Sequence, residues 1–66
     1  MMSEIDQVQL IRQTTNAGLF RFLGYPDMDD VWIPWSLVEE PSPSKDGDIN
    51  VLIIPDWKAE EIGFYS

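Results

Sequence analysis

The chain has 66 residues, 44% of them hydrophobic, with 12 acidic and 4 basic residues and neither cysteine nor histidine. So short a chain predicts a single domain, residues 1–66, in which folding hides only about 60% of the surface of the unfolded chain, and we expect no cofactor-sized pocket within one copy. The missing thiols and imidazoles exclude zinc, haem, iron–sulfur and histidine-based catalytic sites, and we expect no cofactor.

The N-terminal third of the sequence predicts a β-hairpin. Residues 5–14 alternate with a period close to two, as a half-buried strand does. A helix competes, because three apolar residues of this segment also fit a spacing of three. Residues 14–18 favour the strand, because β-branched threonines lead there into a turn with asparagine and glycine. Residues 19–23 then alternate again, with Phe20 and Phe22 on one face, and predict the second strand.

The middle of the chain predicts a loop, a short strand and a single helical turn. Residues 24–30 form the loop, since glycine and proline interrupt any periodicity. Residues 31–33 form a short apolar strand that Pro34 ends, because proline has no N–H to donate. Ser36 is then expected to cap a helical turn, with Glu39 completing a capping box.

The C-terminal third predicts a polar loop, a strand and a helix. Residues 40–47 are rich in proline and serine, which predicts a mobile loop. Residues 49–54 are the most apolar run and are predicted to be the central strand. Residues 55–63 predict a short helix, with Asp56 as its cap or in its first turn and Gly63 as its stop.

Together these elements predict a mainly β fold with one short C-terminal helix. Four to five strands in so short a chain indicate a small twisted sheet that closes into an SH3- or OB-like mini-barrel. A single helix packed on an open sheet is the alternative. Phe64 and Tyr65, which follow the helix, are expected to fold back over the edge of the core.

Acidic residues are the only candidates for acid–base catalysis, and their spacing does not favour it. Glu39 with Glu40, and Glu60 with Glu61, are adjacent in the sequence. Neighbouring residues of a strand or helix point apart, so neither pair forms an acid–base dyad by local geometry. We therefore expect no catalytic residues and no enzymatic activity.

The acidic cluster of Asp27, Asp29 and Asp30 is the one segment that resembles a metal-binding loop. An EF-hand loop needs oxygen ligands at its first, third and fifth positions, glycine at the sixth and glutamate at the twelfth. Here Val31 and Trp32 interrupt the pattern after two matching positions. A solvated loop explains the cluster better than a metal site.

Three tryptophans are many for a chain of this length. A small core gains much from each large aromatic side chain, so Trp57 and Trp32 are expected to be buried. Trp35 follows Pro34 and is out of step with the apolar residues of the strand. An exposed Trp35 beside acidic residues would anchor a protein partner, because tryptophan dominates many interfaces.

The formal net charge of −8 disfavours direct binding to nucleic acids and to anionic membranes. Base stacking on Phe20, Phe22 and Trp32 would need a basic groove, which four basic residues do not provide. The charge either keeps a small protein in solution or imitates a nucleic acid and attracts a protein with a basic surface. Since no segment reaches the roughly 20 apolar residues of a membrane span, and residues 1–6 do not look like a signal peptide, a cytoplasmic location is expected.

Two segments carry a resemblance to short phage-encoded acidic proteins. Residues 31–38, VWIPWSLV, and residues 53–63, IIPDWKAEEIG, resemble the pattern W-I-P-x-S-x-[I/V] followed by P-x-W-x-A-x-x-x-G. The likeness covers the C-terminal half, and Trp35 stands where such proteins more often have lysine or arginine. The resemblance implies no enzymatic role and leaves the family function undefined. A phage origin favours a small inhibitor of a host enzyme or defence system, CRISPR effectors included.

These observations lead to one hypothesis and one alternative. The hypothesis is a small, acidic, non-catalytic and phage-encoded binding protein that inhibits or modulates a host nucleic-acid-handling or defence protein by occupying a basic surface. The alternative is a self-associating module, such as a homodimer, of a phage replication or packaging assembly, paired through an edge strand. The residues predicted to contact the partner are Asp27, Asp29, Asp30, Trp35, Glu39, Glu40, Glu60 and Glu61.

Overall fold

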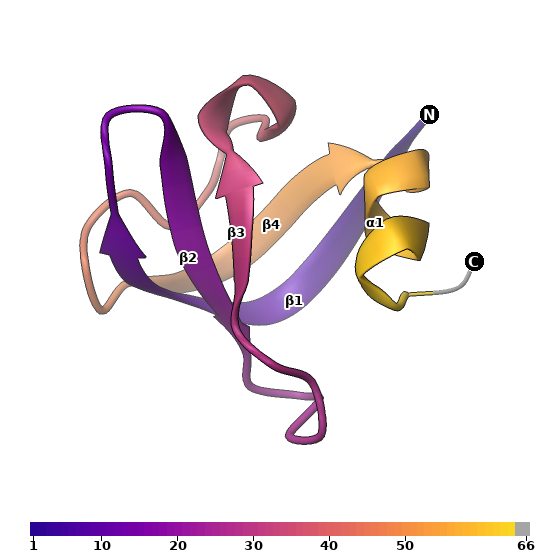
Figure 1. The fold of residues 1–66 in the computed structure, drawn as a ribbon, viewed down its shortest axis with the longest axis horizontal. Coiled ribbons are helices and arrows are strands. Elements are labelled where there is room, and N and C mark those ends of the chain that lie inside the picture. The colour runs from indigo at the N-terminus through magenta and orange to yellow at the C-terminus, as the bar shows by residue number, and fades with distance from the viewer. Residues whose placement is uncertain (65–66) are drawn as a thin grey trace.

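The computed structural model describes residues 1–64, which form four strands, one 3-10 turn and one helix (Figure 1). The elements, in chain order, are β1 (Met2–Gln13), β2 (Ala17–Phe22), β3 (Val31–Pro34), η1 (Trp35–Leu37), β4 (Ile49–Pro55) and α1 (Asp56–Ile62). The prediction of a mainly β fold with a short C-terminal helix is confirmed.

The four strands form one antiparallel sheet in the order β3-β2-β1-β4, and this sheet is open. The predicted mini-barrel is therefore wrong, and the alternative of a helix on an open sheet is right. Pro34 ends β3 and has no N–H with which to extend a ladder, and η1 follows directly. After η1, an isolated β-bridge joins Glu39 to Ile53 of β4, and the Glu39 N–H donates to the Ile53 carbonyl at 2.9 Å.

The position of the most apolar strand differs from the prediction. Residues 49–54 were predicted as the central strand, but β4 lies at an edge, and β1 is central because it pairs with both β2 and β4. β4 is apolar on both faces for a local reason. Leu52 and Ile54 are buried in the core, while Ile53 on the other face is half-buried beneath the bridge from Glu39.

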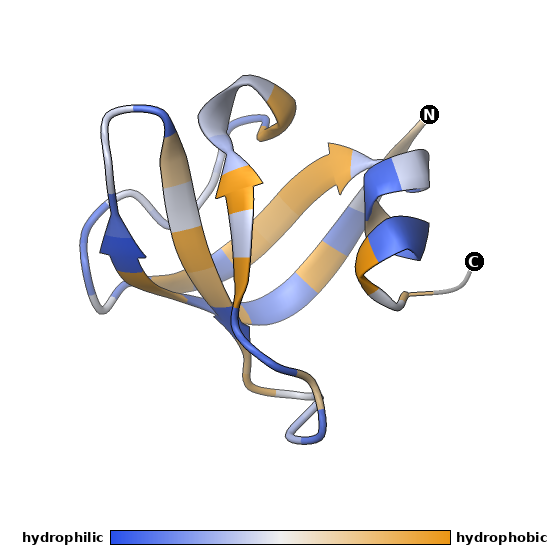
Figure 2. Cartoon of the chain, in the orientation of Figure 1, coloured by the Kyte–Doolittle hydropathy of each residue, from blue (hydrophilic) through white to orange (hydrophobic). Residues whose placement is uncertain are grey.

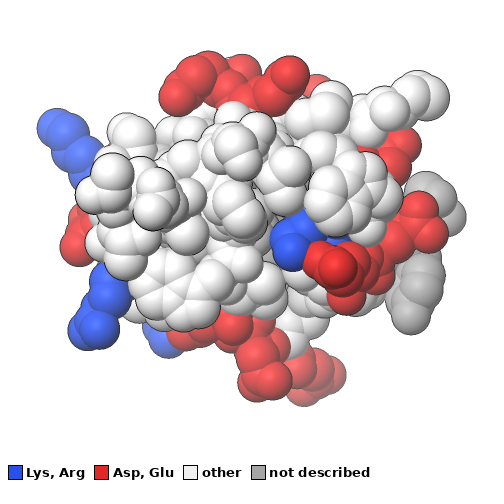
Figure 3. Space-filling model, turned by 45° about the horizontal axis from the view of Figure 1, so that its top comes forward, with Lys and Arg blue, Asp and Glu red and all other residues white. Residues whose placement is uncertain are grey.

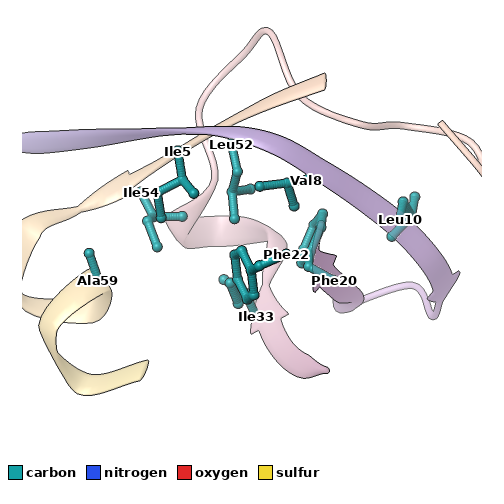
Figure 4. Packing of buried hydrophobic residues seen from close by; sticks show 9 residues of the cluster. All are labelled: Ile5, Val8, Leu10, Phe20, Phe22, Ile33, Leu52, Ile54 and Ala59. Atoms are coloured by element: carbon teal, nitrogen blue, oxygen red, sulfur yellow. The ribbon is translucent and has the colours of Figure 1, made fainter. Parts of the chain in front are cut away.

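The core lies on one face of the sheet and is built by the alternation of strand residues (Figures 2 and 4). Phe20 and Phe22 of β2 are its largest members, and α1 adds Ala59. The buried cluster consists of Ile5, Val8, Leu10, Phe20, Phe22, Ile33, Leu52, Ile54 and Ala59. Side chains two residues apart thus share the buried face, as the period of two predicts.

Two irregularities bend β1. The register with β2 shifts between Leu10 and Arg12, and the register with β4 shifts between Ile5 and Val8. Within the second shift, Gln7 has a φ of 59°, in the left-handed region that non-glycine residues seldom adopt. The Gln7 carbonyl accepts a hydrogen bond from the Leu23 N–H at 2.9 Å. This β-bulge breaks the strict alternation of β1 near its N-terminal end.

The helix α1 begins and ends where the sequence predicts. Pro55 precedes it, and Asp56 lies in its first turn without a side-chain cap. Gly63 ends it with a φ of 117°, and the Phe64 N–H donates to the Ala59 carbonyl at 2.8 Å. Phe64 then packs edge-on against Phe22, with ring centroids 5.0 Å apart, as expected for a residue folded over the core. Tyr65, for which the same was expected, lies outside the described residues.

The predicted capping box is absent from the turn after β3. Pro34 precedes η1, and no side chain caps the turn. Glu39 instead pairs with β4 through its backbone. In a capping box, the Ser36 hydroxyl would accept a hydrogen bond from the Glu39 N–H. The Glu39 N–H donates instead to the Ile53 carbonyl of β4, so the capping box does not form.

The C-terminal part of the loop 40–47 is hydrogen-bonded to β1. The Gly47 N–H donates to the Leu10 carbonyl at 2.7 Å, and the Gln13 side chain donates to the Ser44 carbonyl at 3.0 Å. Ser42 and Pro43 are buried. The mobility of residues 40–47 stays a prediction, and these contacts indicate where the loop is held.

Gly18 provides a sensitive test of the packing between the hairpin and η1. A Cβ atom there would lie 2.9 Å from the Phe20 ring and 2.9 Å from the Trp35 ring. We expect Gly18→Ala to lower the free energy of unfolding by about 1–3 kcal/mol, the usual cost of overpacking. Chemical denaturation measures it, with Gly24→Ala as the control, since nothing lies within 4 Å of a Cβ at Gly24. Equal stability of the two variants would contradict this packing.

Candidate interaction surface

Two of the three tryptophans are more exposed than the sequence predicts. Trp57 is 58% exposed and Trp32 is 45% exposed, so the expectation that both are buried is wrong. Trp57 lies two positions before the buried Ala59, about 200° around the helix, and therefore on the side away from the core. Trp32 precedes the buried Ile33, so the alternation of β3 directs it to the opposite face.

Trp35, predicted to contact the partner and to anchor it if exposed, is half-buried and packs against the hairpin. Its ring meets Phe20 edge-on, with centroids 5.6 Å apart and an interplanar angle of 81°. Its indole N–H donates to the Thr14 carbonyl at 3.2 Å, and its backbone N–H donates to the Asn16 carbonyl at 2.9 Å. Trp57, in contrast, is exposed and lies on α1 with Glu60 and Glu61.

The acidic residues predicted to bind a partner lie on three separate parts of the fold. Asp27, Asp29 and Asp30 lie between β2 and β3, Glu39 and Glu40 follow η1, and Glu60 and Glu61 lie on α1. Figure 3 shows one face with acidic groups around its margin, basic groups mainly on one side and an uncharged centre. The charge on this face is thus distributed among several groups.

Two of these acidic residues form ion pairs within the chain. Arg21 donates two hydrogen bonds to the Asp30 carboxylate, each 3.0 Å long, and Lys58 pairs with Glu61. The hydrogen bonds and charge of Arg21 lower the pKa of Asp30, and Asp30 in turn raises the pKa of Arg21. Asp30 is therefore less available to an external cation than its two neighbours in the loop.

An open groove of about 670 Å³ lies among β1, α1 and the turn after β2. Its volume is that of a small-molecule site, so the expectation of no cofactor-sized pocket is wrong, although the groove is not enclosed. Asp6 and Gln7 lie at the register shift between Ile5 and Val8, and both line the groove, so the β-bulge helps to form the groove. The lining residues are Ser3, Glu4, Ile5, Asp6, Gln7, Gly24, Tyr25, Asp56, Ala59, Glu60 and Phe64.

The groove combines carboxylates with an aromatic wall. Glu4, Asp6, Asp56 and Glu60 line it, and its lining contains no lysine or arginine. Tyr25 meets Phe64 edge-on, with ring centroids 4.7 Å apart and an interplanar angle of 86°. Of the four carboxylates, Glu60 was predicted as a partner-contact residue and Asp56 as the helix cap or a first-turn residue.

The other three carboxylates of the groove, Glu4, Asp6 and Asp56, were not predicted as binding residues, because the groove joins segments that are far apart in the sequence. Asp56 accepts a hydrogen bond from the Ser3 hydroxyl, across 53 positions of the sequence. No local pattern reveals such a pairing. Within residues 1–64, no group of three or more acidic side chains is arranged to hold a metal ion.

Comparison with protein-family models, with curated proteins and with solved structures finds no match for this chain. Within the described part of the chain, no helix has both the length and the apolar character needed to cross a membrane. The candidate interaction surface consists of the outward face of α1 and the acidic groove beside it, and Glu60 belongs to both.

Proposed function

We propose that this protein is a small, acidic, non-catalytic binding protein that occupies a basic surface of a protein partner. The partner class that we propose is a nucleic-acid-handling or defence protein, such as a CRISPR effector, in the cytoplasm of a phage-infected host. The observation that carries the proposal is the outward face of α1, where the exposed Trp57 lies beside Glu60 and Glu61.

The spacing of these three residues makes them one surface. Glu60 and Glu61 follow Trp57 by three and four positions, so all three side chains lie on one face of the helix. An exposed tryptophan with charged residues beside it is common at the centres of protein interfaces. Glu61 is paired with Lys58, so Glu60 is the more available of the two charges, and a basic surface of a partner complements it.

The other acidic residues act in this proposal at longer range. Asp27, Asp29, Glu39 and Glu40 are exposed, and they add to the formal net charge of −8. Charges at a distance speed the encounter of two proteins more than they hold the complex together, and salt screens them. We therefore assign the direct contact to α1 and the steering to these residues.

The sheet edges give less support to the alternative of a self-associating module. On β4, the Ile53 carbonyl is occupied by Glu39, and the Val51 N–H donates to the Asn50 side chain at 2.8 Å. Pro55 ends β4 and Pro34 ends β3, and neither has an N–H to offer. Edges blocked in these ways resist pairing with a second copy.

Capture from the lysate of a host cell tests the proposal. We expect the tagged protein to retain a partner with a basic surface at low salt and to release it at high salt. The double variant Glu60→Gln, Glu61→Gln should lose the partner, while Asp27→Asn, Asp29→Asn, with the same change of charge, should retain most of it. Retention at high salt, or capture only of further copies of this chain, would contradict the proposal.

A further inference from the structure

We propose that the groove between β1 and α1 binds an arginine-containing segment of the partner. The inference rests on the proposed function and specifies which part of a basic partner is recognised. Three properties of the groove support it, namely its size, its unbalanced charge and its aromatic wall.

The size of the groove fits a few side chains of an extended segment. Its volume of about 670 Å³ lies within the roughly 300–1,000 Å³ of typical small-ligand sites. Five consecutive residues of β1, from Ser3 to Gln7, line it. A regular strand would offer only alternate side chains to one side. The bulge at Gln7 interrupts that alternation, so Asp6 and Gln7 both contribute.

The charge of the groove is not balanced from within the lining. Glu4 and Asp6 come from β1, and Asp56 and Glu60 come from α1, so two elements far apart in sequence place carboxylates around one recess. Of the four basic residues of the chain, none lines the groove. Arg21 is bound to Asp30 and Lys58 to Glu61. A cation from outside complements these carboxylates.

The aromatic wall favours arginine over other cations. Tyr25 is 49% exposed, and Phe64 supports it edge-on. A guanidinium group stacks on an aromatic ring and also donates paired hydrogen bonds to a carboxylate. Lysine offers a point charge without the planar fork, and the carboxylates are not arranged to hold a metal ion within residues 1–64. The combination of ring and carboxylates thus matches arginine best.

Titration with a blocked tetra-arginine peptide, followed by calorimetry at low salt, tests the inference. We expect Glu4→Gln, Asp6→Asn to weaken binding at least about tenfold, which is about 1.4 kcal/mol. The control Asp27→Asn, Asp29→Asn removes the same charge from the loop between β2 and β3 and should weaken binding much less. A tetra-lysine peptide should bind more weakly than tetra-arginine. An equal loss in both variants, or no preference for arginine, would overturn the inference.

Amide chemical shifts of the unmodified protein give a second readout that does not depend on the folding of a variant. The tetra-arginine peptide should shift the amide signals of residues 3–7 and 56–64 most. Shifts spread evenly over the acidic loops would overturn the groove as the site. If the peptide does not bind but a partner is still captured in a salt-sensitive way, the groove is not the binding site, and the proposed function stands. If the peptide binds but no partner is captured in a salt-sensitive way, the proposed function is contradicted, and the groove stands as an arginine site.

Discussion

Replacement of Phe20 by alanine is expected to leave the chain largely unfolded at 25 °C. Phe20 is fully buried at the centre of the core, and its ring supports Trp35. Truncation of a buried phenylalanine costs about 3–5 kcal/mol. A chain of 66 residues has a total stability of roughly 3–10 kcal/mol, at about 0.05–0.15 kcal/mol per residue. The loss therefore approaches the whole stability of the fold.

Circular dichroism and thermal melting measure this effect. Leu23→Ala is the matched control, because Leu23 follows β2 directly and is 40% exposed. An exposed truncation of this kind changes stability by about 0.5 kcal/mol or less. A cooperative melt of Phe20→Ala close to that of the control would show that the core is not organised around this residue.

Replacement of Trp57 by alanine is expected to have the opposite character. Since Trp57 is 58% exposed, its loss should leave the stability of the free protein nearly unchanged. The affinity of the Trp57→Ala variant for the captured partner should fall roughly 30-fold or more, because an interface tryptophan of this kind contributes about 2 kcal/mol to binding. Calorimetry with the purified partner measures the affinity, and a thermal melt measures the stability.

Trp32→Ala is the control for this comparison, since Trp32 is 45% exposed but lies on β3. It should bind the partner nearly as well as the unmodified protein. Equal losses in both tryptophan variants, or full affinity of Trp57→Ala, would remove α1 from the contact surface.

The elements of the fold follow from local sequence patterns, whereas their positions in the sheet do not. The alternation around Phe20 and Phe22 and the stop at Gly63 depend on near neighbours, and both were predicted. Whether β4 is central or at an edge depends on which strands pair with β1, which local periodicity does not encode. The open sheet likewise depends on how the chain continues after Pro34.

The candidate surface was predicted only in part, for two physical reasons. Trp57 was expected in the core because of its size, but a helix of seven residues has one buried face, and Ala59 with Ile62 occupies it. The groove requires the bulge at Gln7, a left-handed position that no glycine marks in the sequence. Glu60 and Glu61 were predicted as partner-contact residues for their charge, which the sequence shows directly.

The most direct test of the central claim is the affinity for the purified partner as a function of salt concentration. Electrostatic binding through α1 predicts that affinity falls steadily as salt rises, and that Glu60→Gln, Glu61→Gln weakens both the affinity and its salt dependence. An affinity that does not change with salt, or that is unaffected by this double variant, would contradict binding to a basic surface through α1.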